Sequence, residues 1–180
     1  FKFNGNKYDL AWYNYYEFFY KGIYNNDIKV NSGDIVIDIG ANTGVFTRWA
    51  LSKGAGKVYS VEASHKAYLS LSESFKNDKR VEAIERAMHS TDDQTLTFYD
   101  CIDNTTVSSL LPEQKEDFKN ERSFTEMKVR TMSFGGLIKN HNIQKINLLK
   151  MDIEGGEYEV FKNIDSNFLK NNVDRIILEF

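Results

Sequence analysis

The chain has 180 residues, of which 41% are hydrophobic and 27% are charged, a composition typical of one globular domain with a sizeable core. Its formal net charge of −3 provides no basic surplus to neutralise a run of phosphates, which argues against a nucleic-acid partner. No segment approaches the roughly 18 to 20 apolar residues of a membrane span, and the N-terminus lacks a signal-peptide pattern. The single cysteine, Cys101, can form neither an internal disulfide nor a cysteine-based zinc site, so we expect a soluble, cytoplasmic protein.

Aromatic residues dominate the N-terminal part of the chain. Residues 8–24 place Trp12 and Phe19 at helical spacing, so we expect a helical segment within residues 1–30. Such a stripe usually packs in a core, and the functional alternative is a helix that folds across the mouth of a pocket.

From residue 34 onward, β-rich runs alternate with segments whose apolar residues recur at helical spacing. The expected strands are 34–39, 57–63, 80–87, 146–152 and 174–180, and the expected helices are 43–53, 64–77, 133–141 and 156–164. Two extra strands, 95–99 and 126–132, are expected around a polar, helix-prone insertion. This alternation predicts a single α/β domain whose core, residues 34–180, is a mainly parallel sheet with helices on both faces.

The first expected strand ends in the sequence VIDIGANTG, residues 36–44. In an open parallel sheet, the first strand-to-helix turn usually lies under a cofactor. A dinucleotide-binding turn reads G-x-G-x-x-G, and its second glycine lets a pyrophosphate approach the backbone. Here Asn42 stands in place of that glycine. Asp38, just ahead of the turn, would repel phosphates if it faced the ligand, whereas it would suit a positively charged cofactor. These features favour S-adenosylmethionine, which carries an ammonium and a sulfonium group and no phosphate.

Two further strand ends should lie beside this turn. Glu62 follows Gly40 by 22 residues, at the tip of the second strand, where an acidic side chain can accept hydrogen bonds from ribose hydroxyls. Residues 85–88, Glu-Arg-Ala-Met, end the third strand, where such folds contact adenine. The sequence therefore predicts the ribose and adenine subsites next to the glycine turn.

The segments VIDIGANTGVFT, VYSVEAS, ERAMHS, LLKMDIEGGEYEVF and IILEF together resemble the S-adenosylmethionine-dependent methyltransferases of the FkbM type, over residues 18–180. The resemblance implies a Rossmann-like class I methyltransferase fold and an acceptor hydroxyl on a sugar, polyketide or other small metabolite. It implies that the methionine part and the turn are lined by Asp38, Gly40, Ala41, Asn42, Gly44 and Thr47. The predicted cofactor site also includes Glu62, Ala63, Arg86, Ala87 and Asp152. It further implies that three carboxylates face the reaction centre, Asp152, Glu154 and Glu157.

A complete sheet of this fold ends in a C-terminal antiparallel hairpin, which does not follow IILEF here. The chain also starts on Phe1 and not on a methionine. We therefore expect a piece of a longer protein that lacks the strands of this hairpin, and the alternative is a trimmed form of the fold.

Three interpretations of the acidic sequence DIEGGE compete. In the first, Glu154 and Glu157 merely place negative charge in the first turn of a helix, which stabilises it by about 0.3–1 kcal/mol per residue. In the second, which we favour, Asp152 accepts a hydrogen bond from the cofactor ammonium or the substrate, and Glu154 is a general base or substrate anchor. In the third, the carboxylates hold a divalent cation. Lys150 could neutralise this cluster or contact a substrate.

We predict no metal site, because the three histidines, His65, His89 and His141, show no metal-ligand spacing. Of these, only His89 is placed near the cofactor end of the sheet.

Two rival functions share parts of this pattern. An NAD- or FAD-dependent oxidoreductase also has a glycine turn followed by an acidic residue, and a non-catalytic domain of the same fold could bind a partner or a glycan. The N-P-P-Y or D-P-P-Y segment of base methyltransferases is absent, because DIEGGEY stands in its place. We therefore expect an O-methyltransferase for a small molecule or saccharide. Its acceptor pocket should be lined by the aromatic N-terminal segment, residues 102–125 and the DIEGGE turn.

Overall fold

The computed structural model describes residues 28–101, 108–118 and 123–178. The expected N-terminal helix at 8–24 lies outside the described residues. The expectation that residues 1–180 form one domain stays a prediction.

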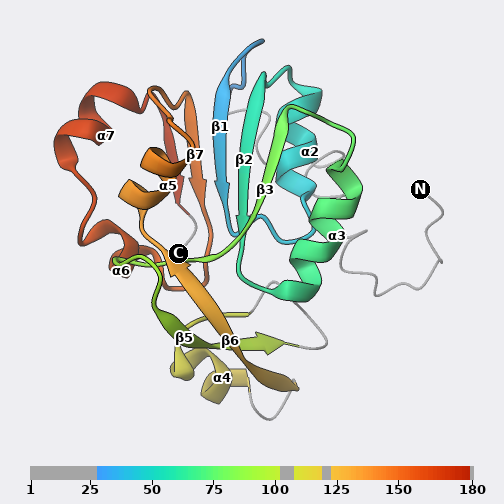
Figure 1. Ribbon diagram of the computed structural model, residues 1–180, viewed down its shortest axis with the longest axis vertical. Coiled ribbons are helices and arrows are strands. Elements are labelled where there is room, and N and C mark those ends of the chain that lie inside the picture. The colour runs from blue at the N-terminus through green and yellow to red at the C-terminus, as the bar shows by residue number, and fades with distance from the viewer. Residues whose placement is uncertain (1–27, 102–107, 119–122, 179–180) are drawn as a thin grey trace.

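The centre of the structure is a five-stranded, entirely parallel sheet (Figure 1). Its strands in spatial order are β3 (Val81–Glu85), β2 (Lys57–Glu62), β1 (Ile35–Ile39), β7 (Leu148–Met151) and β8 (Ile176–Leu178). Apolar residues predominate in the central strands β1 and β7, because both faces of the sheet are covered there. The chain order reverses between β1 and β7, and ligands of such sheets bind beyond the carboxyl ends of the strands at this switch point.

Helices cover both faces of the sheet, as predicted. One face carries α2 (Val45–Ser52) and α3 (His65–Phe75), and the other carries α5 (Phe134–Asn140), α6 (Glu157–Phe161) and α7 (Ser166–Asn172). Alternation along β1 separates the two cores, since Val36 packs with α2 whereas Ile37 and Ile39 pack against α5 to α7. Each of these fully buried side chains contributes about 1.5–3 kcal/mol.

A second, smaller sheet lies beyond the carboxyl ends of the main strands (Figure 1). It consists of β4 (Ala87–Met88), β6 (Phe124–Met132) and β5 (Thr95–Cys101), with β6 parallel to β4 and antiparallel to β5. The short helix α4 (Pro112–Phe118) lies in the insertion between β5 and β6. The two extra strands predicted from the sequence are therefore confirmed, and they form a separate layer.

Three sequence predictions need correction. The strand expected at 80–87 is broken at Arg86, whose N–H donates to the carbonyl oxygen of Glu62 at 3.0 Å, and the chain then leaves the main sheet to form β4. The helix expected at 156–164 is shorter, because α6 ends at Phe161. Helix α7 was missed, although Asp165 caps its first turn by accepting from the N–H of Asn167 at 2.8 Å.

Candidate active site

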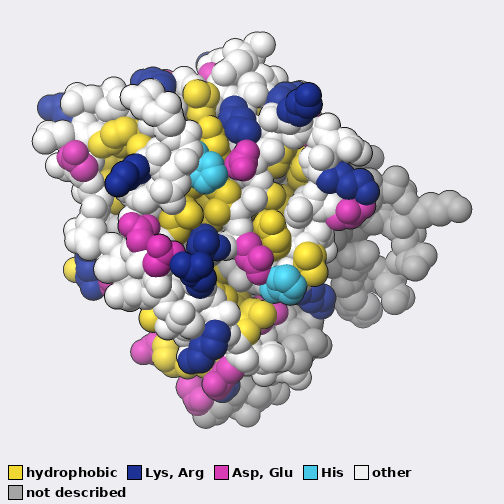
Figure 2. All heavy atoms as spheres, in the orientation of Figure 1, with side chains coloured by type: hydrophobic (Ala, Val, Ile, Leu, Met, Phe, Trp, Pro, Cys, Tyr) yellow, Lys and Arg dark blue, Asp and Glu magenta, His cyan; other side chains and the backbone are white. Residues whose placement is uncertain are grey.

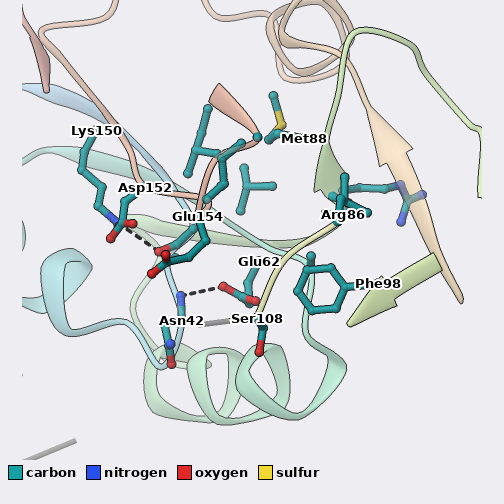
Figure 3. Close-up of a pocket in the computed structure, with 18 of the residues that line it drawn as sticks. Asn42, Glu62, Arg86, Met88, Phe98, Ser108, Lys150, Asp152 and Glu154 are labelled. Atoms are coloured by element: carbon teal, nitrogen blue, oxygen red, sulfur yellow. Dashed lines mark hydrogen bonds and ion pairs between the residues drawn. The ribbon is translucent and has the colours of Figure 1, made fainter. Parts of the chain in front are cut away.

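A pocket opens at the carboxyl ends of β1, β2 and β7, at the switch point of the sheet (Figure 3). One side of the pocket is formed by the glycine turn, the end of β2 and the residues around β4. The rest is formed by the second sheet, the insertion that follows β5 and the DIEGG turn. The predicted site residues that line it are Gly40, Ala41, Asn42, Glu62, Ala63, Arg86, Ala87, Asp152 and Glu154. Residues far apart in the sequence therefore meet here, as the positions of the strand ends require.

The glycine turn has a left-handed backbone at several positions. Gly40 has φ 75°, and a Cβ atom there would lie 1.7 Å from the carbonyl oxygen of Asp152. Only glycine allows β1 and β7 to end this close together. Asn42 has φ 49°, a conformation that asparagine adopts more readily than most residues. Gly44 lies behind the pocket, where a Cβ would meet Leu71 at 2.7 Å.

Glu62 is held by the backbone of the two turns beside it. Its Oε2 accepts from the N–H of Asn42 and its Oε1 from the N–H of Ser64, both at 2.7 Å. Burial raises the pKa of this carboxyl from 4.5 to about 7, although the two backbone hydrogen bonds oppose the shift. Each carboxylate oxygen has a second lone pair, so Glu62 can accept two more hydrogen bonds from a ligand.

A buried lysine lies between two carboxylates at the base of the pocket. Lys150 Nζ is 3.5 Å from Asp38 Oδ1 and 3.3 Å from Asp152 Oδ2, and it donates to the carbonyl oxygen of Gly40 at 3.0 Å. Asp38 is fully buried behind the lining, where its Oδ2 accepts from Thr47 Oγ1 at 2.7 Å. Burial raises the pKa of Asp38, and the charge of Lys150 opposes this shift.

The three carboxylates of DIEGGE have different environments. Asp152 and Glu154 line the pocket, on the same side as Lys150 and across from Arg86 and Phe98 (Figure 3). Glu157 is 2% exposed, and its Oε1 accepts from the N–H of Ile153 at 2.8 Å. The side chain of Glu157 therefore closes the turn that presents the other two.

The second sheet supplies a pocket residue that sequence reasoning missed, Phe98 of β5. Ser108 and Leu110 also line the pocket, and they lie within residues 102–125, where the sequence predicted part of the acceptor pocket. Phe98 and Ser108 are both less than a tenth exposed. Strand alternation could have marked Phe98 as buried, but the sequence carries no signal that this face of β5 turns toward the end of β2.

Among the described residues, no group of three or more histidine, cysteine, aspartate or glutamate side chains is arranged to hold a metal ion. His89 does not line the pocket; its Nε2 lies 3.8 Å from Glu159 Oε1 on α6. Within residues 28–101, 108–118 and 123–178, no helix is long and apolar enough to cross a membrane.

Comparison with protein families decides the identity of the domain. The family model described as the methyltransferase FkbM domain matches residues 38–180, which include the glycine turn, Glu62 and the DIEGGE turn. The chain belongs to the FkbM methyltransferase family. The match confirms the family resemblance of the sequence motifs, and it covers the whole pocket described above.

One of the solved structures that resemble the chain supports the fold of an FkbM domain. The methyltransferase FkbM from Methylobacillus flagellatus KT matches 88% of this chain with a TM-score of 0.52 and 12% sequence identity, and the match spans 35% of that protein. Fibrillarin from Aeropyrum pernix, solved with natively bound S-adenosyl-L-methionine, matches 73% of this chain and 38% of its own, with a TM-score of 0.36 and 13% identity.

A further structure, an S-adenosylmethionine-dependent methyltransferase from Mesorhizobium loti, matches 37% of this chain and 32% of its own, with a TM-score of 0.29 and 28% identity. The chain thus spans roughly a third of the length of each of these structures. None of the curated proteins matches the sequence. The FkbM structure confirms the Rossmann-like fold, since it alone of the three aligns over most of the chain with a TM-score above 0.5.

Proposed function

We propose that this FkbM domain binds S-adenosylmethionine in the pocket and transfers its methyl group to a hydroxyl oxygen of a small-molecule or saccharide acceptor. The observation that carries the proposal is the charge of the pocket wall. Three carboxylates, of Glu62, Asp152 and Glu154, outnumber the two cations, of Lys150 and Arg86, in the lining of a pocket whose first turn has Asn42 where a pyrophosphate needs glycine. A ligand with an ammonium and a sulfonium complements this wall, whereas a dinucleotide would be repelled.

The residues present fit the parts of this cofactor. Glu62 would accept hydrogen bonds from the ribose hydroxyls through its remaining lone pairs. The apolar wall formed by Ala87, Phe98 and Leu110 would hold the adenine ring. Asp152, whose carboxylate is 31% exposed beside Lys150, would accept from the ammonium of the methionine part. The remaining predicted residues, Asp38, Gly44 and Thr47, would support the turn from behind.

The bound cofactor would supply a methyl group on a positively charged sulfur, which is a good leaving group. The protein must then align an acceptor oxygen and take its proton. We assign the removal of the hydroxyl proton to Glu154, which lines the pocket from the DIEGGE turn, and the binding of the cofactor ammonium to Asp152. Glu157 would act by fixing the turn that carries Glu154.

The choice of an acceptor other than nucleic acid rests on the charge of the surface. On the face shown in Figure 2, Lys and Arg side chains are interspersed with Asp and Glu over the ends of the main sheet and the second sheet. Nucleic-acid binding favours a continuous basic surface instead. The net charge of −3 agrees with this choice.

Calorimetric titration with S-adenosylhomocysteine, NAD and FAD tests the proposal. We expect binding of S-adenosylhomocysteine alone, weakened at least tenfold, or about 1.4 kcal/mol, by Glu62→Ala. Glu82→Ala is the matched control, because Glu82 is an exposed glutamate on β3 that pairs with Lys57 at 3.3 Å. Binding of NAD or FAD would show that an oxidoreductase is the better interpretation. Cofactor binding without transfer to any acceptor in a broad panel would favour a non-catalytic domain.

A further inference from the structure

A short segment of the insertion is attached to the turn that carries Glu154. Ser109, which is 1% exposed, donates from its Oγ to the carbonyl oxygen of Glu154 at 2.9 Å. The same Oγ accepts from the N–H of Leu111 at 3.1 Å. The Leu111 side chain packs beneath Gly155, where an added Cβ would lie 2.8 Å from Leu111 Cδ1. Two independent contacts therefore hold this turn against the insertion.

The backbone held by these contacts has an unusual conformation. Glu154 has φ 54° and Gly155 has φ 91°, both in the left-handed region. A glutamate adopts this region only where surrounding contacts compensate, and such residues concentrate at functional sites. The direction of the Glu154 side chain depends on this backbone. The hydrogen bond from Ser109 therefore acts at the point that decides where the carboxylate lies.

Ser109 is itself anchored to the second sheet. Its backbone exchanges hydrogen bonds with Tyr99 of β5 in both directions, at 2.9 and 3.2 Å. The preceding residue, Ser108, donates to Asp100 Oδ1 at 3.0 Å and accepts from the N–H of Cys101 at 2.9 Å. The hydroxyl of Ser109 thus projects from a segment that is hydrogen-bonded to β5.

We propose that Ser109 is a positioning residue that aims the Glu154 carboxylate at the place of methyl transfer. The second sheet, which contributes none of the DIEGGE residues, would then help to set the geometry of the transfer site through this hydroxyl, while Leu111 packs against the same turn. The inference rests on the proposed function, because it assumes that the transferred methyl group lies beside Glu154.

Sinefungin provides a test that needs no acceptor, because its ammonium stands where the methyl group of S-adenosylmethionine is attached. Calorimetry gives the ratio of its affinity to that of S-adenosylhomocysteine, which lacks this group. We expect the wild type to prefer sinefungin about tenfold through a charge-assisted hydrogen bond to Glu154. Glu154→Gln and Ser109→Ala should each remove most of this preference, while affinity for S-adenosylhomocysteine changes less than about threefold.

Two further variants separate positioning from stability. Ser109→Thr keeps the donor and should keep the preference for sinefungin, whereas Ser109→Cys keeps the size with a weaker donor and should lose much of it. If the alanine variant does not fold, the loss of the preference for sinefungin can be measured in Ser109→Cys instead. In a variant that lacks both Ser109 and Glu154, the loss should equal that of Glu154→Gln alone, because the two residues act in series.

The outcomes distinguish this inference from the proposed function. A wild type that binds neither compound would refute the cofactor assignment itself. A wild type that binds both compounds equally, or an alanine variant that keeps the full preference, would overturn the role of Ser109 and leave the cofactor assignment intact.

Discussion

Protonation of Glu62 should control both the stability of the protein and its affinity for the cofactor. The carboxyl is 8% exposed, and burial raises its pKa from 4.5 to about 7. That difference corresponds to about 3 kcal/mol between the two protonation states. Because the pKa is raised on folding, the stabilisation is fully present below pH 4.5 and is lost as the pH rises through about 7.

Cofactor binding should respond to pH in the opposite direction. The ribose hydroxyls would donate to the ionised carboxylate, so affinity for S-adenosylhomocysteine should fall below pH 7 by up to about tenfold per pH unit. After the two backbone hydrogen bonds, the charge of Lys150, which lowers the pKa of Glu62, and the charge of Asp38, which raises it, have the largest effects. Calorimetry at pH 6 and pH 8, in two buffers with different ionisation enthalpies, measures both the affinity and the protons released on binding.

Glu62→Gln is the control that assigns the effect to this residue, because it removes the titration without removing the side chain. We expect weaker binding by the variant, with a dissociation constant that changes little between the two pH values. Equal wild-type affinity at pH 6 and pH 8, with no proton released, would refute the assignment of Glu62 as the ribose acceptor. A pH dependence that persists unchanged in the variant would assign the titration to another group.

Two further predictions concern the base of the pocket. Gly40→Ala should destabilise the fold by several kcal/mol in urea unfolding, since the new Cβ would lie 1.7 Å from the Asp152 carbonyl oxygen. The control is Gly33→Ala, which should lose only about 1–2 kcal/mol, because Gly33 has a similar φ of 85° but a Cβ there would have no atom within 4 Å. Equal losses of stability in the two variants would contradict the packing argument. Lys150→Met should cost about 3 kcal/mol or more because it leaves the buried Asp38 carboxylate without its cation, and adding Asp38→Asn should restore part of that stability in thermal unfolding. A double variant no more stable than Lys150→Met would show that the ion pair is not the cause.

The sequence by itself determined the architecture and the chemistry of the glycine turn. Strand and helix periods differ, so the alternation of elements could be read along the chain and gave a parallel α/β sheet, which the structure confirms. The parallel arrangement then required Gly40, Glu62 and Asp152 to meet at one edge, because the carboxyl ends of parallel strands share that edge. The replacement of a glycine by Asn42 also needed no coordinates.

Only the tertiary structure decided how the rest of the site is built. The break at Arg86 and the pairing of β4 with β6 are long-range events that no local period encodes, and they bring Phe98 to the pocket. The burial that shifts the pKa of Glu62, and the contact of Ser109 with Glu154 across 45 residues of sequence, depend on the same packing. Local sequence patterns specify what each segment can form, whereas the neighbours of a side chain, and therefore its charge state and direction, are set by residues distant along the chain.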